Sequence, residues 1–169
     1  MKSQIKSGMS HLDMSRDQFL ANINKTASAQ FDKLTIGAAV LNSDNRILLL
    51  RRRPDEKHYP NVYEITGGKV DETDPTIGQA IAREVLEESS LKVSAVLKPL
   101  STITYNTFSA AGTRNVIQLS YVVQVEDTQF QVNPEEHSKG IWAAMDMLGE
   151  LDITEDMKDL VMEALASVQ

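Results

Sequence analysis

The stretch GGKVDETDPTIGQAIAREVLEESSL, residues 67–91, combines a glycine pair, a polar loop and a helical pattern rich in glutamate. Within it, residues 76–89 carry Ile77, Ile81 and Val85 at intervals of four, a spacing that returns side chains to one face of an α-helix. We therefore predict an amphipathic helix, with a buried apolar face and a charged face beside it.

Three carboxylates of this helix, those of Glu84, Glu87 and Glu88, lie within an arc of about 100° around its axis. The arc borders the apolar face, so the three negative charges repel one another where burial makes charge costly unless a cation compensates. Carboxylate and backbone carbonyl oxygens are the ligands that Mg²⁺ and Mn²⁺ prefer. The pattern favours a divalent metal site over the alternative, a solvated helix face.

Two neighbouring features support a ligand site. Arg83 precedes Glu87 by four residues, so a charge-assisted pair between them would orient the carboxylate. Gly67 and Gly68 follow the strand-like run of residues 62–65 and form a tight turn, whose backbone can approach a ligand closely.

Taken together, the loop and the helix resemble the signature of the Nudix hydrolase family, G-x5-E-x7-R-E-U-x-E-E-x-G-U, in which U is aliphatic. Gly68 matches the first glycine, residues 83–88 match the R-E-U-x-E-E core without a gap, and Leu91 matches the last aliphatic position. The strands around the segment also follow the family's order, so the resemblance extends over residues 34–166.

The chain departs from the signature at a few positions. Asp74 stands near the first glutamate, and one extra residue, placed at Pro75, separates it from the arginine. Ser90 replaces the last glycine, where a left-handed backbone costs more for a residue with a side chain. Many members carry proline before the two glycines and tryptophan nearby, where this chain has Thr66 and Tyr63.

The resemblance implies roles for the matched residues. Glu84, Glu87 and Glu88 would bind the metal, Mg²⁺ or Mn²⁺, or activate water, and the carbonyl of Gly68 would be a further ligand. Arg83 would orient the glutamates. The reaction implied is hydrolysis of a diphosphate linkage by attack of water at one phosphorus.

Further candidates lie outside the signature. Arg51 and Arg53 share a face if the strand of residues 47–51 continues, and are predicted to bind a substrate phosphate; the alternative is a solvated edge. Tyr63 is predicted to line the substrate pocket, although strand aromatics more often pack in a core. By resemblance, Glu136 on a late loop completes the metal site or acts as the base, and His137 beside it is expected to be structural or exposed.

The chain of 169 residues suits one domain. We expect an N-terminal extension over residues 1–30, with a short helix from Ser15 that buries Phe19, Leu20 and Ile23 and with mobile first ten residues, followed by a Nudix domain over residues 31–169. Residues 35–42 and 47–51 are expected to form a β-hairpin, and a helix is expected from Thr154. The fold class is α/β (α+β): an α/β/α sandwich with a mixed central sheet.

Composition excludes several classes of function. The net charge of -7 argues against a nucleic-acid polymer as partner. No apolar run reaches the length of a membrane helix, the first twenty residues do not look like a secretory signal, and the absence of cysteine excludes disulfides and thiolate sites. We expect a cytoplasmic protein with a small-molecule diphosphate as its partner, and a homodimer as the default assembly.

Three functions remain open. The first is hydrolysis of a nucleoside diphosphate derivative or another organic diphosphate. The second is an isoprenyl diphosphate-processing enzyme, although an isopentenyl diphosphate isomerase uses a cysteine that is missing here. The third is a catalytically silent Nudix module that binds a ligand. Specificity is expected to reside in residues 1–30, 54–61 and 105–114.

Overall fold

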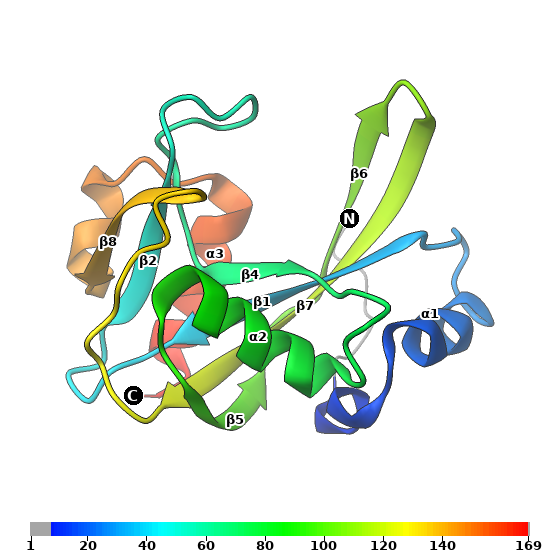
Figure 1. The fold of residues 1–169 in the computed structure, drawn as a ribbon, viewed down its shortest axis with the longest axis horizontal. Helices are drawn as coiled ribbons and strands as arrows, with labels where there is room; N and C mark the ends of the chain where they lie inside the picture. The colour runs from blue at the N-terminus through cyan, green and yellow to red at the C-terminus, as the bar shows by residue number, and fades with distance from the viewer. Residues whose placement is uncertain (1–7, 169) are drawn as a thin grey trace.

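The computed structural model describes residues 8–168 and contains two β-sheets flanked by helices (Figure 1). The strands of the larger sheet are β1 (Lys33–Val40), β4 (Thr66–Lys69), β5 (Val93–Pro99), β6 (Ile103–Ser109) and β7 (Gly112–Val125). Their order is β4-β1-β7-β5, and β6 also pairs with β7. Because β1 runs parallel to β7 while the other pairs are antiparallel, this sheet is mixed, as predicted.

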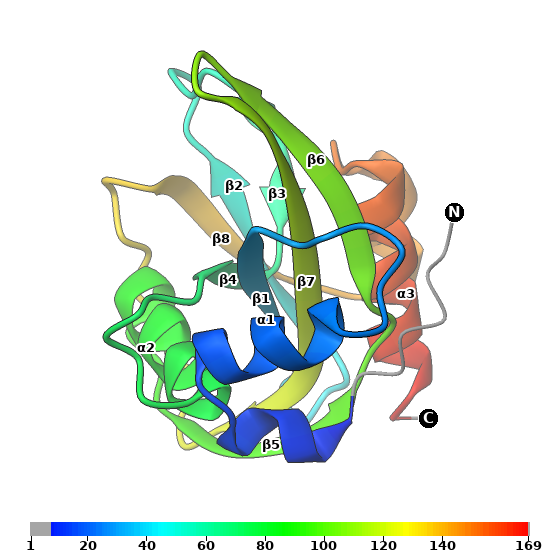
Figure 2. The same cartoon turned by 90° about the vertical axis from the view of Figure 1, so that its right-hand side faces the viewer.

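The smaller sheet is antiparallel, with β2 (Ile47–Arg52) between β3 (Tyr63–Glu64) and β8 (His137–Ala143). Helix α2 (Ile77–Ser89), α1 (Arg16–Asn24) and the 3-10 helix η1 (Met9–Asp13) lie on one side of the larger sheet. Helix α3 (Glu155–Ala166) and the 3-10 helix η2 (Met145–Glu150) lie on the other, as Figure 2 shows. The chain is thus an α/β/α sandwich.

The side chains of β1 explain the two layers of helices. Leu34, Ile36 and Ala38 belong to the core cluster that also contains the apolar face of α2, whereas Ala39 belongs to the cluster that contains α3. Alternate residues of a strand face opposite sides of a sheet. A strand buried on both faces therefore needs a helix on each side.

The helices begin where the sequence predicts. Thr76 and Thr154 are the N-caps of α2 and α3, and each side-chain oxygen accepts a backbone N–H of its own helix. Ser15 caps α1, in which Phe19 is buried. Of the first ten residues, for which mobility is predicted, residues 1–7 lie outside the described part of the chain.

The predicted hairpin of residues 35–42 and 47–51 is wrong. β1 and β2 lie in different sheets, and only a bridge between Leu41 and Ile47 joins their ends. Both edges of β1 are already occupied, by β4 and β7, so β2 has no free edge to pair with. Residues 42–46 do form a turn, but the two strands diverge beyond it.

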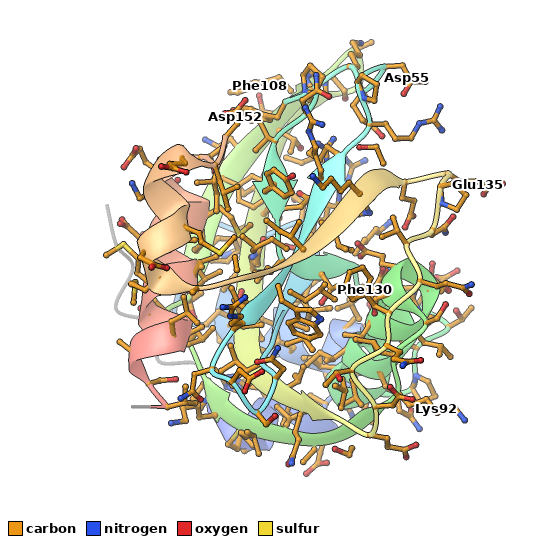
Figure 3. The ribbon with its side chains drawn as sticks, turned by 90° about the vertical axis from the view of Figure 1, so that its left-hand side faces the viewer. Asp55, Lys92, Phe108, Phe130, Glu135 and Asp152 are labelled. Atoms are coloured by element: carbon orange, nitrogen blue, oxygen red, sulfur yellow. The ribbon has the colours of Figure 1, made fainter. Side chains whose placement is uncertain are left out.

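A tight hairpin turn joins β6 to β7, with Ser109 paired to Gly112. The tip is exposed: Phe108 retains 79% of its accessible surface. The tip, marked by Phe108, and the loop after β2, marked by Asp55, project at the same end of the molecule (Figure 3). No helix among residues 8–168 has the length and apolar character needed to cross a membrane.

Candidate functional site

Helix α2 presents its glutamates in two environments. Glu84 and Glu88 are buried, because they lie beside the apolar positions Ile81 and Val85 and face the sheet. Glu87 is half-exposed. The arc of carboxylates predicted from the sequence is therefore present, and two of its three carboxylates, those of Glu84 and Glu88, are buried.

The glycine pair of β4 brings backbone against these carboxylates. The amide N–H of Gly67 donates to Oε1 of Glu88 at 3.0 Å. A Cβ on Gly68 would lie 2.6 Å from the carboxylate carbon of Glu84, and a Cβ on Gly67 would lie 2.2 Å from the carbonyl oxygen of Ile36. Only glycine fits at position 67, because the backbone of β1 approaches it closely, whereas a side chain at position 68 would displace the carboxylate of Glu84.

Arg83 holds the loop and the helix together. Its Nε and Nη2 donate to the two carboxylate oxygens of Asp74, at 2.7 and 2.8 Å. Its Nη1 donates to Glu84 at 2.9 Å and to Glu87 at 3.2 Å. The expected pair with Glu87 is present, but the bidentate partner is the buried Asp74, whose pKa is lowered chiefly by the hydrogen bond from Arg83.

The departures from the signature are accommodated locally. Asp74 also accepts the N–H of Asp71 at 2.8 Å, so the shorter carboxylate closes the loop and still reaches the guanidinium. Ser90 adopts a left-handed conformation, with φ 61°, at the C-cap of α2. Neither departure moves the three glutamates off their predicted face.

The segment before β8 is docked on the end of α2 through its backbone. The N–H groups of Gln131 and Asn133 donate to the carbonyls of Ser89 and Glu88, at 2.9 and 3.2 Å. The carbonyl of Asn133 then accepts from the amides of Glu136 and His137. These bonds place a late loop, far away in sequence, directly against Glu88.

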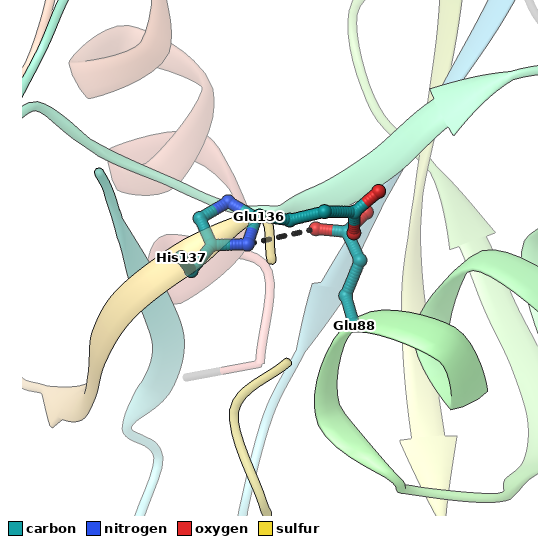
Figure 4. A group of neighbouring side chains, drawn as sticks. All are labelled: Glu88, Glu136 and His137. Carbon is teal, nitrogen blue, oxygen red and sulfur yellow. Dashed lines mark ion pairs between the residues drawn. The ribbon is translucent and has the colours of Figure 1, made fainter. Parts of the chain in front are cut away.

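The resulting cluster contains Glu88, Glu136 and His137, each with a ligand atom within 4.8 Å of the others (Figure 4). Nδ1 of His137 lies 3.6 Å from Oε2 of Glu88, and Nε2 lies 2.9 Å from Oε1 of Glu64. Sequence reasoning selected Glu136 but missed His137 and Glu64. The alternation of the short strand β3 was the available signal for Glu64, since it points Glu64 and Tyr63 to opposite faces.

Burial dominates the electrostatics of the site. It raises the pKa of Glu88 to about 9, against the hydrogen bond from Gly67, and the charges of Glu136 and Glu64 act in the same direction as burial. Burial also raises the pKa of Glu84, against the charge of Arg83. A divalent cation suits this donor set, because its charge would favour the ionised forms of the two buried carboxylates, whose pKa values burial raises.

The comparison with protein families agrees with this geometry. A family model described as "NUDIX domain" matches residues 32–164. The chain belongs to the Nudix family. Among curated proteins, no sequence matches this chain.

Solved structures share the fold of this Nudix domain. The Nudix domain of Shewanella oneidensis NrtR, complexed with ADP ribose, aligns with a TM-score of 0.66 and 20% identity, covering 92% of this chain and 100% of that chain. A MutT Nudix hydrolase from Burkholderia pseudomallei aligns with a TM-score of 0.61 and 24% identity, over 78% and 96% of the two chains. The E. coli dihydroneopterin triphosphate pyrophosphohydrolase aligns with a TM-score of 0.61 and 21% identity, over 81% and 99%.

Within residues 8–168, the basic and aromatic candidates of this Nudix domain form no hydrogen bond with Glu88, Glu136 or His137. Arg51 donates to the carbonyl of Asn61, and Arg53, beyond the end of β2, pairs with Asp55 and donates to the carbonyl of Glu135. The register of β2 against β8 shifts between Arg51 and Arg52, which breaks the alternation assumed from the sequence. Tyr63 is only 8% exposed and packs in the core on the α3 side, so it does not line the site.

Lys69, the residue after Gly68, lines a cleft of about 450 Å³. Its charged lining residues are Arg16, Asp17, Asp32, Lys33, Lys69 and Arg114. Four cations against two carboxylates make this surface locally basic, in a chain whose net charge is -7. The Nudix loop therefore lies between an acidic cluster and a basic cleft.

Proposed function

We propose that this Nudix domain hydrolyses a diphosphate linkage in a nucleoside diphosphate derivative or another organic diphosphate, with a divalent metal ion. One observation carries the proposal: Glu84 and Glu88 are buried against the backbone of Gly67–Gly68, while Arg83 contacts both Glu84 and Glu87. Burying carboxylates in this way costs stability. Their burial is therefore better explained by the binding of a cation and an anionic substrate than by a structural role.

The residues proposed to hold the metal are the Gly68 carbonyl, Glu84, Glu87 and Glu88, with Glu136 completing the site from the late loop. When bound, Mg²⁺ or Mn²⁺ neutralises the phosphate oxygens and lowers the pKa of the attacking water. Oxygen donors of this kind are the common ligands of both ions.

The proposed base is Glu84. Its pKa is raised by burial, which makes its ionised form a stronger proton acceptor. The contact of 2.9 Å with Nη1 of Arg83 fixes its orientation, and Asp74 fixes that of Arg83 in turn. Glu136 is the alternative base, since its carboxylate lies in the cluster with Glu88 and its charge also acts on Glu84.

The test is a screen of diphosphate substrates with Mg²⁺ or Mn²⁺. ADP-ribose and dihydroneopterin triphosphate belong in it because structures of similar fold act on or bind them, together with nucleotides, sugar nucleotides and isoprenyl diphosphates. We expect metal-dependent cleavage of at least one compound. Glu87→Gln should abolish it, and Glu135→Gln, an exposed neighbour of Glu136, should not. Full activity of Glu87→Gln would overturn the assigned roles.

The same screen separates the other two functions. A silent module would bind a ligand in calorimetry without turnover, but the departures that suggest it, Asp74 and Ser90, fit the loop and the helix end. An isoprenyl diphosphate-processing enzyme would give a different product by mass spectrometry. We also propose residues 1–30 as an extension that packs on the domain through Phe19, with residues 31–169 as the catalytic unit.

A further inference from the structure

The imidazole of His137 is buried beside the proposed metal site, with only 4% of its surface exposed. Its Nε2 contacts Glu64, but its Nδ1 has no hydrogen-bond partner within residues 8–168. A buried polar atom without a partner is costly, so native structures usually satisfy it.

The contacts of Glu64 determine which ring nitrogen carries the hydrogen. Glu64 lies 3.4 Å from the guanidinium of Arg52, and its Oε1 lies 2.9 Å from Nε2 of His137. Because an ionised carboxylate only accepts, Nε2 is the donor, and the neutral ring then has a lone pair on Nδ1. Histidine ligands in metalloproteins are commonly oriented in this way, with the distal N–H bonded to a carboxylate.

The lone pair on Nδ1 lies near the carboxyl group of Glu88 but forms no hydrogen bond with it. Oε2 of Glu88 lies 3.6 Å away, and Glu136 extends toward the same point in Figure 4. This distance is too long for a hydrogen bond. It falls within the separation of roughly 3.0–4.2 Å expected for two ligands that each lie about 2.1 Å from one ion.

We propose that Nδ1 of His137 is a nitrogen ligand of a metal ion shared with Glu88 and Glu136, and that this site prefers Mn²⁺ or another first-row transition ion to Mg²⁺. Imidazole is a good ligand for transition ions, whereas Mg²⁺ favours oxygen donors and water. The inference deepens the proposed function, since it concerns the metal that the hydrolysis would use.

The experiment measures Mn²⁺ bound to the full-length protein, without substrate, by electron spin echo envelope modulation. We expect a hyperfine coupling to a histidine nitrogen that changes when histidine is labelled with the heavy nitrogen isotope. The coupling should persist in His58→Gln, a loop histidine, and disappear in His137→Gln. Calorimetry should show the Mn²⁺ affinity of His137→Gln reduced by roughly tenfold or more, with a smaller change for Mg²⁺.

The wild-type spectrum decides the matter even if His137→Gln fails to fold. Bound Mn²⁺ without any nitrogen coupling, or equal affinities for Mn²⁺ and Mg²⁺ in the wild type, would overturn the histidine ligand. Substrate cleavage measured with Mg²⁺ on the same preparation is a separate result. Cleavage without the nitrogen coupling would support the proposed hydrolase and overturn the histidine ligand. The nitrogen coupling without cleavage would support the histidine ligand and count against the proposed hydrolase.

Discussion

Among single residues, Asp74 offers the sharpest test of how the site is held. It is buried and bidentate to Arg83, so Asp74→Asn should lower the free energy of unfolding by about 3 kcal/mol near pH 7. Its folded pKa is lowered below 3.8, so this contribution is complete above pH 3.8 and is lost as the pH falls through the folded pKa.

Urea unfolding at a series of pH values checks this prediction. The difference between wild type and Asp74→Asn should shrink as the pH falls below 3.8 and the wild-type carboxyl becomes protonated in its turn. Asp44→Asn, in the exposed turn after β1, is the matched control and should change little. A constant difference at every pH would contradict the ion-pair account.

Gly68 tests the close approach of backbone to carboxylate. Its φ is not in the left-handed region, and the three atoms nearest to a Cβ added at Gly68 all belong to the carboxylate of Glu84, the far end of a flexible side chain. We expect a near-normal melting temperature but a loss of metal-dependent hydrolysis of about 100-fold, because Glu84 is displaced. Gly149→Ala, where no atom lies within 4 Å of the added Cβ, should keep its activity. Equal activities would disprove the steric argument.

Which residues could be predicted depended on the range of the contacts that place them. Glu84, Glu87 and Glu88 follow from helical periodicity, a local property, and so does their position beside Ile81 and Val85. His137 meets Glu88 only because Asn133 is bonded to the end of α2, which no local pattern reveals. Of the residues that long-range pairing brings to the site, Glu136 was selected only through the family resemblance, and His137 and Glu64 were missed.

At the scale of elements, the end of α2 carries a strained residue. Ser90 has φ 61°, a conformation that glycine adopts without a steric penalty. Ser90→Gly should raise the free energy of unfolding by about 0.5–1 kcal/mol, as measured by chemical denaturation. Ser94→Gly, an exposed position in β5, should lower it, because glycine weakens a strand. A loss of stability in Ser90→Gly would show that its hydroxyl matters more than its backbone.

The elements themselves were easier to predict than their pairing. α2 and α3 begin directly after Thr76 and Thr154, where the helices were predicted to start, because the apolar spacing of a helix is a property of neighbouring residues. The hairpin of β1 and β2 failed, because the turn between them is compatible both with pairing and with a crossing into another sheet. The outcome depends on β7, which is distant in sequence and pairs with an edge of β1, so that β2 cannot pair there.

For the whole molecule, the site lies where the two sheets and α2 meet. Gly67 and Gly68 come from the larger sheet, Glu64 and His137 from the smaller one, and Glu88 from the helix. The site therefore depends on the docking of both sheets rather than on any single element. Unfolding would separate these elements, so the protonation of any group in the site should affect the free energy of unfolding of the whole protein.

Glu88 should make the metal-free protein less stable as the pH rises. Its pKa is raised from 4.5 to about 9 in the folded state, so between these values the folded protein retains a proton that the unfolded chain has lost. This contribution is complete below pH 4.5 and is lost as the pH rises toward 9, by at most about 1.4 kcal/mol per pH unit.

Denaturant unfolding in EDTA from about pH 5 to pH 9 measures this slope. Glu88→Gln keeps an acceptor for the Gly67 amide and should remove most of the slope, whereas Glu87→Gln, at a half-exposed position, should retain it. Adding Mn²⁺ near pH 8 should stabilise the wild type, since the ion binds the folded protein with Glu88 ionised, but should stabilise Glu88→Gln much less. Identical pH profiles for wild type and Glu88→Gln would mean that Glu88 is ionised without a metal and that no cation is needed to keep it so.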